Sequence, residues 1–220
     1  MKIRRLVTIA LLAAMSLGAL AASPKREFRS IWMAAMGIDW PTNEGGGVGL
    51  GPSYEAKAKA ELIQYLDNFK QHNFNGVCVH VRPLADAYYK STLEPWSASL
   101  TGVRGQDPGW DPLAFAVEEC HKRGLECYAW INPFRIDKEG NTLTTPFDLE
   151  WREKGWELKS GNWTIFNPAI PEARQHCLDV IREIYTNYDI DGFLFDDYFY
   201  PGDQISKGPS AGDYKMWQDA

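Results

Sequence analysis

The sequence predicts an α/β fold in which the strands of one parallel sheet alternate with helices. Four short runs of β-branched, aromatic and aliphatic residues lack polar alternation, which is typical of strands buried on both faces. The three segments between them repeat apolar residues with the helical period. The resulting order, βαβαβαβ, requires parallel pairing through right-handed crossovers.

The four predicted strands cover residues 28–36, 76–81, 125–131 and 192–195. Each strand is followed by a long segment that we expect to be a loop: residues 37–53, 82–110, 132–170 and 198 onward. Parallel strands place their carboxyl ends at one edge of the sheet, where α/β proteins bind their ligands. The sequence therefore predicts a functional site formed by these four segments.

The three predicted helices have apolar stripes or clear end signals. The first covers residues 54–72, where apolar residues recur at i, i+3, i+4 and i+7. The second begins with Asp111 as N-cap and Pro112 in the first turn, and Gly124 follows its end. The third covers residues 171–187 and begins at a proline.

Residues 1–22 predict a secretory signal peptide. Three basic residues precede an apolar run over residues 6–20, and the pattern Ala19-Leu20-Ala21 is typical of a cleavage site. The apolar run is shorter than the roughly 20 residues that a membrane span needs. We therefore expect cleavage near Ala22 or Ser23, and a mature protein that is exported to the periplasm or secreted, with no membrane span.

The composition excludes several classes of protein. Of the 220 residues, 45% are apolar, 13% are aromatic and 24% are charged, which excludes disordered, collagen-like and coiled-coil chains. The formal net charge is -6, and without the three basic residues of the signal peptide it becomes -9, from 20 Lys plus Arg against 29 Asp plus Glu. This charge has the wrong sign for binding phosphate backbones, so we expect no nucleic acid partner.

The cysteines are even in number, and in an exported protein they could form disulfides. Each lies in an apolar run or on a periodic helix face, however, and their spacing does not suit zinc. We favour buried thiols that pack as small hydrophobic side chains at Cys78, Cys120, Cys127 and Cys177.

Polar or charged residues follow every predicted strand at its carboxyl end. The first strand leads to Asp39, the second to Arg82, the third to Asn132, and the fourth to Asp196 and Asp197. Each residue alone is equally well explained by a loop cap or a salt bridge. Together they indicate a site, because barrel enzymes take their catalytic groups from several strand ends.

The strongest candidates for chemistry are Asp196 and Asp197. Two adjacent acids after an apolar strand are costly to bury unless they are paired, hydrogen-bonded or used in a reaction. Neighbouring side chains on a strand point to opposite faces, so we expect one acid to face the site and the other to orient Arg82 or a loop. The alternative is that both cap a turn. A glycosidase needs a second carboxyl about 5 to 9.5 Å away, which need not be adjacent in sequence.

Aromatic residues outside the strands suit a carbohydrate site. The chain has nine Trp, and six lie in predicted loops: Trp40, Trp96, Trp110, Trp151, Trp156 and Trp163. Indole rings can stack on sugars, with Arg82, Asp86 and Asn132 as hydrogen-bonding partners, or can instead cover the sheet and its helices. Histidines do not add to this site: we interpret His80 as a satisfied core residue, and His72, His121 and His176 as surface residues.

Several motifs resemble those of one bacterial family. In order over residues 26–202 they are Arg26-Glu27-Phe28-Arg29, Asp39-Trp40-Pro41, Val81-Arg82-Pro83, Asp86-Ala87-Tyr88-Tyr89, Asn132-Pro133-Phe134-Arg135, Phe166-Asn167-Pro168 and Asp196-Asp197-Tyr198-Phe199-Tyr200-Pro201. This series is similar to the glycosyl hydrolase-like family ten. The resemblance implies a (β/α)8 fold, the TIM barrel, and glycosidase activity with no cofactor or metal. Some relatives act on the glycan strands of peptidoglycan.

The resemblance also implies roles for residues in these motifs. Asp196 and Asp197 fall in the acidic active-site motif and are the predicted catalytic residues. By the same resemblance, Arg82, Asn132 and Tyr198 line the cleft. With residues of the other motifs they form the predicted substrate-binding set: Asp39, Trp40, Arg82, Asp86, Asn132, Asn167, Tyr198 and Tyr200.

Only about the first four βα units of such a barrel can be counted before Ala220. We therefore expect residues 23–220 to be the N-terminal portion of a single TIM-barrel domain that is truncated, or else one half of a pair of associated copies. A half barrel exposes two sheet edges and an apolar inner face, which full closure removes. The partner carboxylate is then expected beyond residue 220.

The primary hypothesis is an exported glycoside hydrolase that cleaves O-glycosidic bonds of a polysaccharide, such as cell-wall peptidoglycan, by carboxylate acid/base chemistry. The competing hypothesis is a non-catalytic glycan-binding protein of the cell envelope. A third and weaker alternative is a hydrolase that uses Asp196 and Asp197 as ligands of a divalent metal.

Overall fold

The computed structural model describes residues 27–42, 48–138, 143–160 and 162–196. Its main sheet has four parallel strands: β1 (Ser30–Met33), β2 (Gly76–Arg82), β3 (Glu126–Ile131) and β7 (Gly192–Phe195). Their order in the sheet, β1-β2-β3-β7, is their order along the chain. The four predicted strands and their parallel pairing are confirmed.

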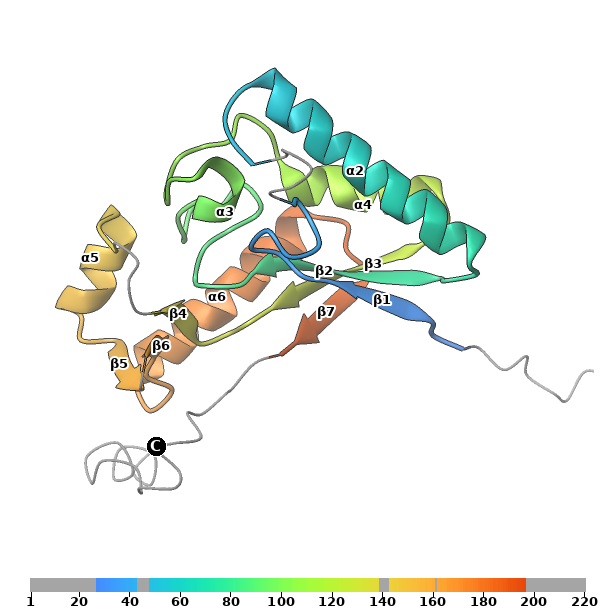
Figure 1. Cartoon of the computed structure of the whole chain (residues 1–220). Helices are drawn as coiled ribbons and strands as arrows, with labels where there is room; N and C mark the ends of the chain where they lie inside the picture. Colours follow the sequence, from blue (N-terminus) through green and yellow to red (C-terminus); the bar gives the residue numbers. More distant parts are fainter. Residues whose placement is uncertain (1–26, 43–47, 139–142, 161, 197–220) are drawn as a thin grey trace, which may run out of the picture.

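The three long helices are α2 (Pro52–Gln71), α4 (Pro112–Lys122) and α6 (Pro171–Asn187). They connect successive strands of the main sheet and pack on the same side of it (Figure 1). All three were predicted; α2 begins two residues earlier than expected, at Pro52, and ends one residue earlier, at Gln71. One short helix, α3 (Ala98–Thr101), lies in the connection between β2 and α4.

The main core lies between the sheet and these helices. Val77, Val79 and Val81 alternate along β2, so they share the face that packs against the helices. There they belong to one buried cluster with Leu62 of α2 and Ile184 of α6. All residues of β2 are buried, which explains why its sequence lacks the alternation of polar and apolar residues that a half-exposed strand shows.

The opposite face of the sheet, which we call the inner face, carries aromatic side chains. Trp32 of β1 and Trp130 of β3 lie together, with ring centroids 5.3 Å apart, and the ring of His80 from β2 lies 3.9 Å from that of Trp130. The Trp32 side chain is 50% exposed, because no described helix covers this face. The inner face is therefore apolar and partly open.

A second, antiparallel sheet forms where a loop was predicted over residues 132–170. It consists of β4 (Arg135–Lys138), β5 (Glu157–Ser160) and β6 (Trp163–Phe166) in the order β4-β6-β5, with helix α5 (Pro146–Glu153) between β4 and β5. The loop prediction was wrong for this segment. Each of its strands has four residues, which is too short for an alternating pattern to stand out in the sequence.

All four cysteines are buried and unpaired, which confirms the prediction of packed thiols. The Cys177 thiol also donates a hydrogen bond to the Pro133 carbonyl, at 2.9 Å. The predicted signal peptide lies outside the described residues. Within the described ranges, no helix has both the length and the apolar character needed to cross a membrane.

The N-cap of α4 gives a first prediction. Asp111 accepts a hydrogen bond from Ala114 N at 3.0 Å, which confirms the predicted cap, and its other oxygen accepts from the Tyr188 hydroxyl at 2.6 Å. We expect Asp111→Ala to lower the free energy of unfolding by about 2 kcal/mol, the upper end for a lost cap. Chemical denaturation measures this loss. Glu118→Ala, at an exposed position of the same helix, is the control; equal losses in both variants would contradict the capping role.

Candidate active site

A hollow of about 450 Å³ lies at the carboxyl ends of the parallel strands. All four strands contribute to it, as the sequence analysis expected for a site of this kind. The lining residues are Ala34, Ala35, Met36, Ile38, His80, Trp130, Asn132, Arg135 and Asp196. The hollow thus combines apolar walls with one acid, one guanidinium, one amide and one imidazole.

Asp196 follows β7 directly and reaches this hollow. Its backbone N–H donates to the Ile131 carbonyl at 3.2 Å, which ties it to the end of β3. Leu194 pairs with Trp130, and Asp196 lies two residues further on, so its side chain is on the same side of the sheet as these two. Asp196 is the member of the acidic pair that the structure describes, and its carboxylate is half-buried in the hollow wall.

His80 lies beneath Trp130 on the inner face. The two rings are nearly parallel, with an angle of 6° between them, and His80 is 7% exposed. The pKa of His80 is lowered to about 3, mainly by burial; a hydrogen bond to the Asn132 side chain opposes this shift, and the nearby Arg135 charge adds to it. The imidazole is therefore neutral. The interpretation of His80 as a core residue is confirmed by its burial. Its Nε2, however, has no hydrogen-bond partner among the described residues, so the expectation that its polar atoms are satisfied was wrong for this nitrogen.

The neutrality of His80 gives a second prediction. We expect its ring proton resonances not to titrate between pH 8 and pH 5 in nuclear magnetic resonance spectra, although an unperturbed imidazole has a pKa of about 6.5 and would titrate in this range. Because the folded pKa is lower than the unfolded one, the folded state loses stability as the pH falls from about 6.5 toward about 3. A change of the His80 resonances between pH 8 and pH 5 would contradict its burial.

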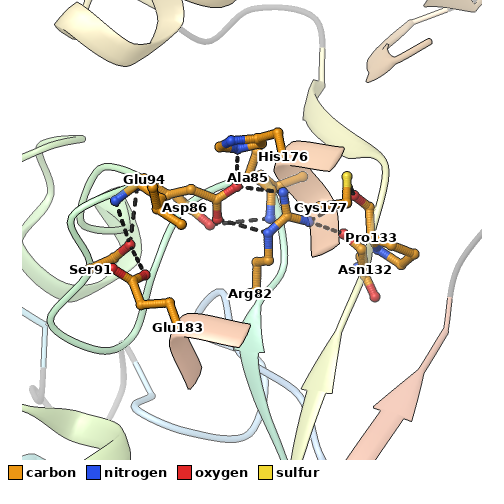
Figure 2. Close-up of polar contacts among 12 residues, drawn as sticks. Arg82, Ala85, Asp86, Ser91, Glu94, Asn132, Pro133, His176, Cys177 and Glu183 are labelled. Carbon is orange, nitrogen blue, oxygen red and sulfur yellow. Dashed lines mark hydrogen bonds and ion pairs between the residues drawn. The ribbon is translucent and has the colours of Figure 1, made fainter. Parts of the chain in front are cut away.

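Arg82 is the centre of a buried polar network next to the hollow (Figure 2). Its Nε and Nη2 donate to the two carboxylate oxygens of Glu94 at 2.7 and 2.5 Å, and both side chains are at most 1% exposed. Its Nη1 donates to the carbonyls of Asn132 and Pro133, at 2.5 and 3.0 Å. Arg82 therefore holds the chain at the end of β3, and it is not among the residues that line the hollow.

Glu94 is fully ionised in this network. Burial alone raises the pKa of the carboxyl, but the Arg82 charge and the His176 hydrogen bond overcome it and lower the pKa to about 2. His176 Nε2 lies 3.2 Å from Glu94 Oε1, and its ring packs between Trp151, Trp156 and Phe166. The prediction of a surface position for His176 was wrong, because the unpredicted second sheet and α5 cover this face of α6.

Four other predicted site residues do not line the hollow and form hydrogen bonds or ion pairs within the protein. Asp39 accepts from Ala34 N at 2.7 Å, and the 2% exposed Trp40 donates its indole N–H to the Ala58 carbonyl at 2.8 Å. Asp86 is buried and lies 3.4 Å from Arg104, and burial raises its pKa. The Asn167 amide oxygen accepts from Ala169 N at 2.9 Å. The remaining predicted residues, Asp197, Tyr198 and Tyr200, lie outside the described residues.

Sequence reasoning did not place Trp130, His80 and Arg135 in the site. Trp130 lies within a strand, and only the Trp residues of predicted loops were considered as sugar contacts. The alternation of β3 is the signal that finds it, since Tyr128, Trp130 and Asn132 occupy every second position. Arg135 begins β4, and its guanidinium lies 3.9 Å from the centre of the Trp163 ring. In the part of the chain that the structure describes, no cluster of three or more His, Cys, Asp or Glu side chains could hold a metal ion.

The chain is similar to a known protein family. The family model described as glycosyl hydrolase-like 10 matches residues 27–218. The chain belongs to this family. Glycosyl hydrolase YngK of Bacillus subtilis is 43% identical over 183 residues, which cover 82% of this chain and 34% of YngK. Glycosyl hydrolase DigH of Escherichia coli K12 is 32% identical over 201 residues, which cover 84% of this chain and 46% of DigH.

This glycosyl hydrolase-like 10 chain spans between about a third and a half of the length of these curated relatives. A solved structure with a similar fold is the GH36 α-galactosidase AgaA A355E of Geobacillus stearothermophilus, with a TM-score of 0.50 and 10% identity. The likeness covers 88% of this chain and 25% of that one, and it concerns the fold alone. The predicted TIM-barrel fold is confirmed: β1, β2, β3 and β7 with their helices form about the first four βα units of a (β/α)8 barrel.

Proposed function

We propose that this chain carries part of the active site of a glycoside hydrolase that cleaves O-glycosidic bonds of a polysaccharide, with cell-wall glycan as the substrate. One observation carries the proposal: the Asp196 carboxylate lies at the end of a barrel strand, in a hollow that also contains an indole ring, an amide and a guanidinium. Membership of a glycosyl hydrolase-like family supports the same chemistry.

Carboxyl groups alone suffice for this reaction. One acid protonates the leaving oxygen, and a second carboxylate either activates water or attacks the sugar, while an oxocarbenium-like state forms between them. We assign one of these roles to Asp196 or to its neighbour Asp197, and the other member of the pair orients it. Asn132, on the hollow wall, is the predicted substrate contact that the geometry supports best.

The test uses the protein expressed from its complete gene and soluble glycan strands prepared from peptidoglycan. Release of new reducing ends is the expected result. Glycan binding without new reducing ends would instead favour the non-catalytic glycan-binding alternative. Loss of activity with a chelator, restored by a divalent cation, would favour the metal-dependent alternative.

We propose further that the protein is exported and loses residues 1–22. The support is the basic, apolar and small-residue pattern of this segment. N-terminal sequencing of the mature protein from a cell fractionation should find Ala22 or Ser23 as the first residue. An intact N-terminus in the cytoplasmic fraction would overturn this proposal.

A further inference from the structure

We propose that Trp130 is the platform on which one pyranose ring of the substrate stacks, beside Asp196; this inference rests on the proposed function. Trp130 lines the hollow and comes from the inner face of β3. Flat aromatic rings bury a large apolar area at a low cost in conformational entropy, and their faces match the apolar faces of sugar rings.

Among the described residues, one ring lies parallel to Trp130. It is His80, at a centroid distance of 3.9 Å, whereas Trp32 approaches Trp130 at 5.3 Å with the rings tilted by 57°. The Trp130 side chain is nevertheless only half-buried. Part of it therefore remains accessible, and this residue lines the hollow.

The ring is also held in place before any ligand arrives. Trp130 Nε1 donates to Asn132 Oδ1 at 3.2 Å, and Asn132 Nδ2 donates to the Pro83 carbonyl at 3.2 Å. Arg82 in turn holds the Asn132 carbonyl. A platform that is ordered in advance does not lose rotamer freedom on binding, which favours affinity.

Trp130 and Asp196 lie close together on the inner face of the sheet. Trp130 pairs with Leu194, and Asp196, directly after β7, is the next residue on the same side, about 7 Å further along the chain. A sugar stacked on the indole would therefore present its glycosidic oxygen toward the carboxylate. His80 is neutral and stacks against the ring, so a sugar that covers the platform does not bury a charged imidazole.

The test measures glycan binding and cleavage separately. On an Asp196→Asn background, isothermal titration with soluble peptidoglycan glycan strands should show that Trp130→Leu weakens binding about tenfold or more, and that Trp130→Phe weakens it much less. Trp110→Leu is the matched control, because Trp110 is a half-buried indole that packs against Trp40 and Phe115 and does not line the hollow, and we expect the binding of this variant to be unchanged. In the cleaving protein, Trp130→Leu should raise KM by a similar factor.

The outcomes separate this inference from the proposed function. Cleavage by the wild-type protein with unchanged binding by Trp130→Leu would overturn the platform and leave the hydrolase proposal intact. If the protein binds glycan through Trp130 but does not cleave it, the platform is supported and the hydrolase proposal is overturned. Absence of both binding and cleavage would overturn both.

A second measurement applies even if Trp130→Leu does not fold. In protein labelled with 5-fluorotryptophan, the fluorine resonance that is missing from the Trp130→Phe variant identifies Trp130. We expect this resonance to shift when the glycan strands are added. A resonance that stays in place while the glycan is bound would overturn the platform.

Discussion

Replacing Asp196 by Asn is expected to lower kcat for glycan cleavage by about 10²- to 10⁴-fold, the usual contribution of a positioned acid or base. The amide is nearly isosteric with the carboxyl, so the shape of the hollow is preserved. It cannot act as an acid or a base, so proton transfer in the reaction is lost. Asp197→Asn is expected to have a comparable effect if that residue is the acting acid. The measurement is the rate at which reducing ends are released from soluble glycan strands at saturating substrate.

The matched control is Asp189→Asn. The Asp189 side chain is 97% exposed and precedes β7, whereas Asp196 follows that strand at its carboxyl end. The control changes the net charge by the same amount and should leave kcat unchanged. Unchanged turnover in both the Asp196 and the Asp197 variants would exclude the acidic pair from catalysis.

The second large effect is expected in the buried pair of Arg82 and Glu94. Glu94→Gln removes the carboxylate that neutralises Arg82 and leaves a guanidinium that is 1% exposed without its counter-charge. Breaking such a pair costs about 3–5 kcal/mol of unfolding free energy. Denaturation monitored by circular dichroism would measure the loss.

The control for this prediction replaces both partners, as Arg82→Met with Glu94→Leu. Apolar side chains of similar size avoid the unpaired charge, so the double variant should be more stable than Glu94→Gln alone. If Glu94→Gln is as stable as the wild-type protein, the pair does not contribute as we describe.

The same pair sets an acid limit for stability. The folded pKa of Glu94, about 2, is below its ordinary value of 4.5, so its contribution is present above pH 4.5 and is lost as the pH falls toward 2. A shift of this size corresponds to about 3 kcal/mol, in agreement with the cost of breaking the pair. The Glu94→Gln variant should lack this part of the pH dependence.

Much of the barrel half could be predicted because its signals are local. The apolar run of β2 and the N-cap Asp111 each depend on residues within one strand or one helical turn. The second sheet escaped prediction because its strands have four residues each and its packing partners lie on α6. The polar residues at the strand ends correctly predicted that the hollow lies at the carboxyl ends of the parallel strands.

The roles of individual polar residues at that edge depended on the tertiary structure. His80 and Arg82 are two positions apart and would share a face in a regular strand, but the register of β2 shifts between them. Their surroundings therefore differ: His80 stacks on Trp130, and Arg82 bonds Glu94. His176 joins the same network from 82 residues further along the chain than Glu94.

The sequence by itself determined the order of the main-sheet strands and the three long helices, the family, and the position of Asp196 directly after β7. Only the tertiary structure decided which polar side chains reach the hollow and which are neutralised in the interior. The physical reason is the range of the interactions. Periodicity and capping act between residues a few positions apart, whereas the partner of a buried charge is set by segments that the fold brings together.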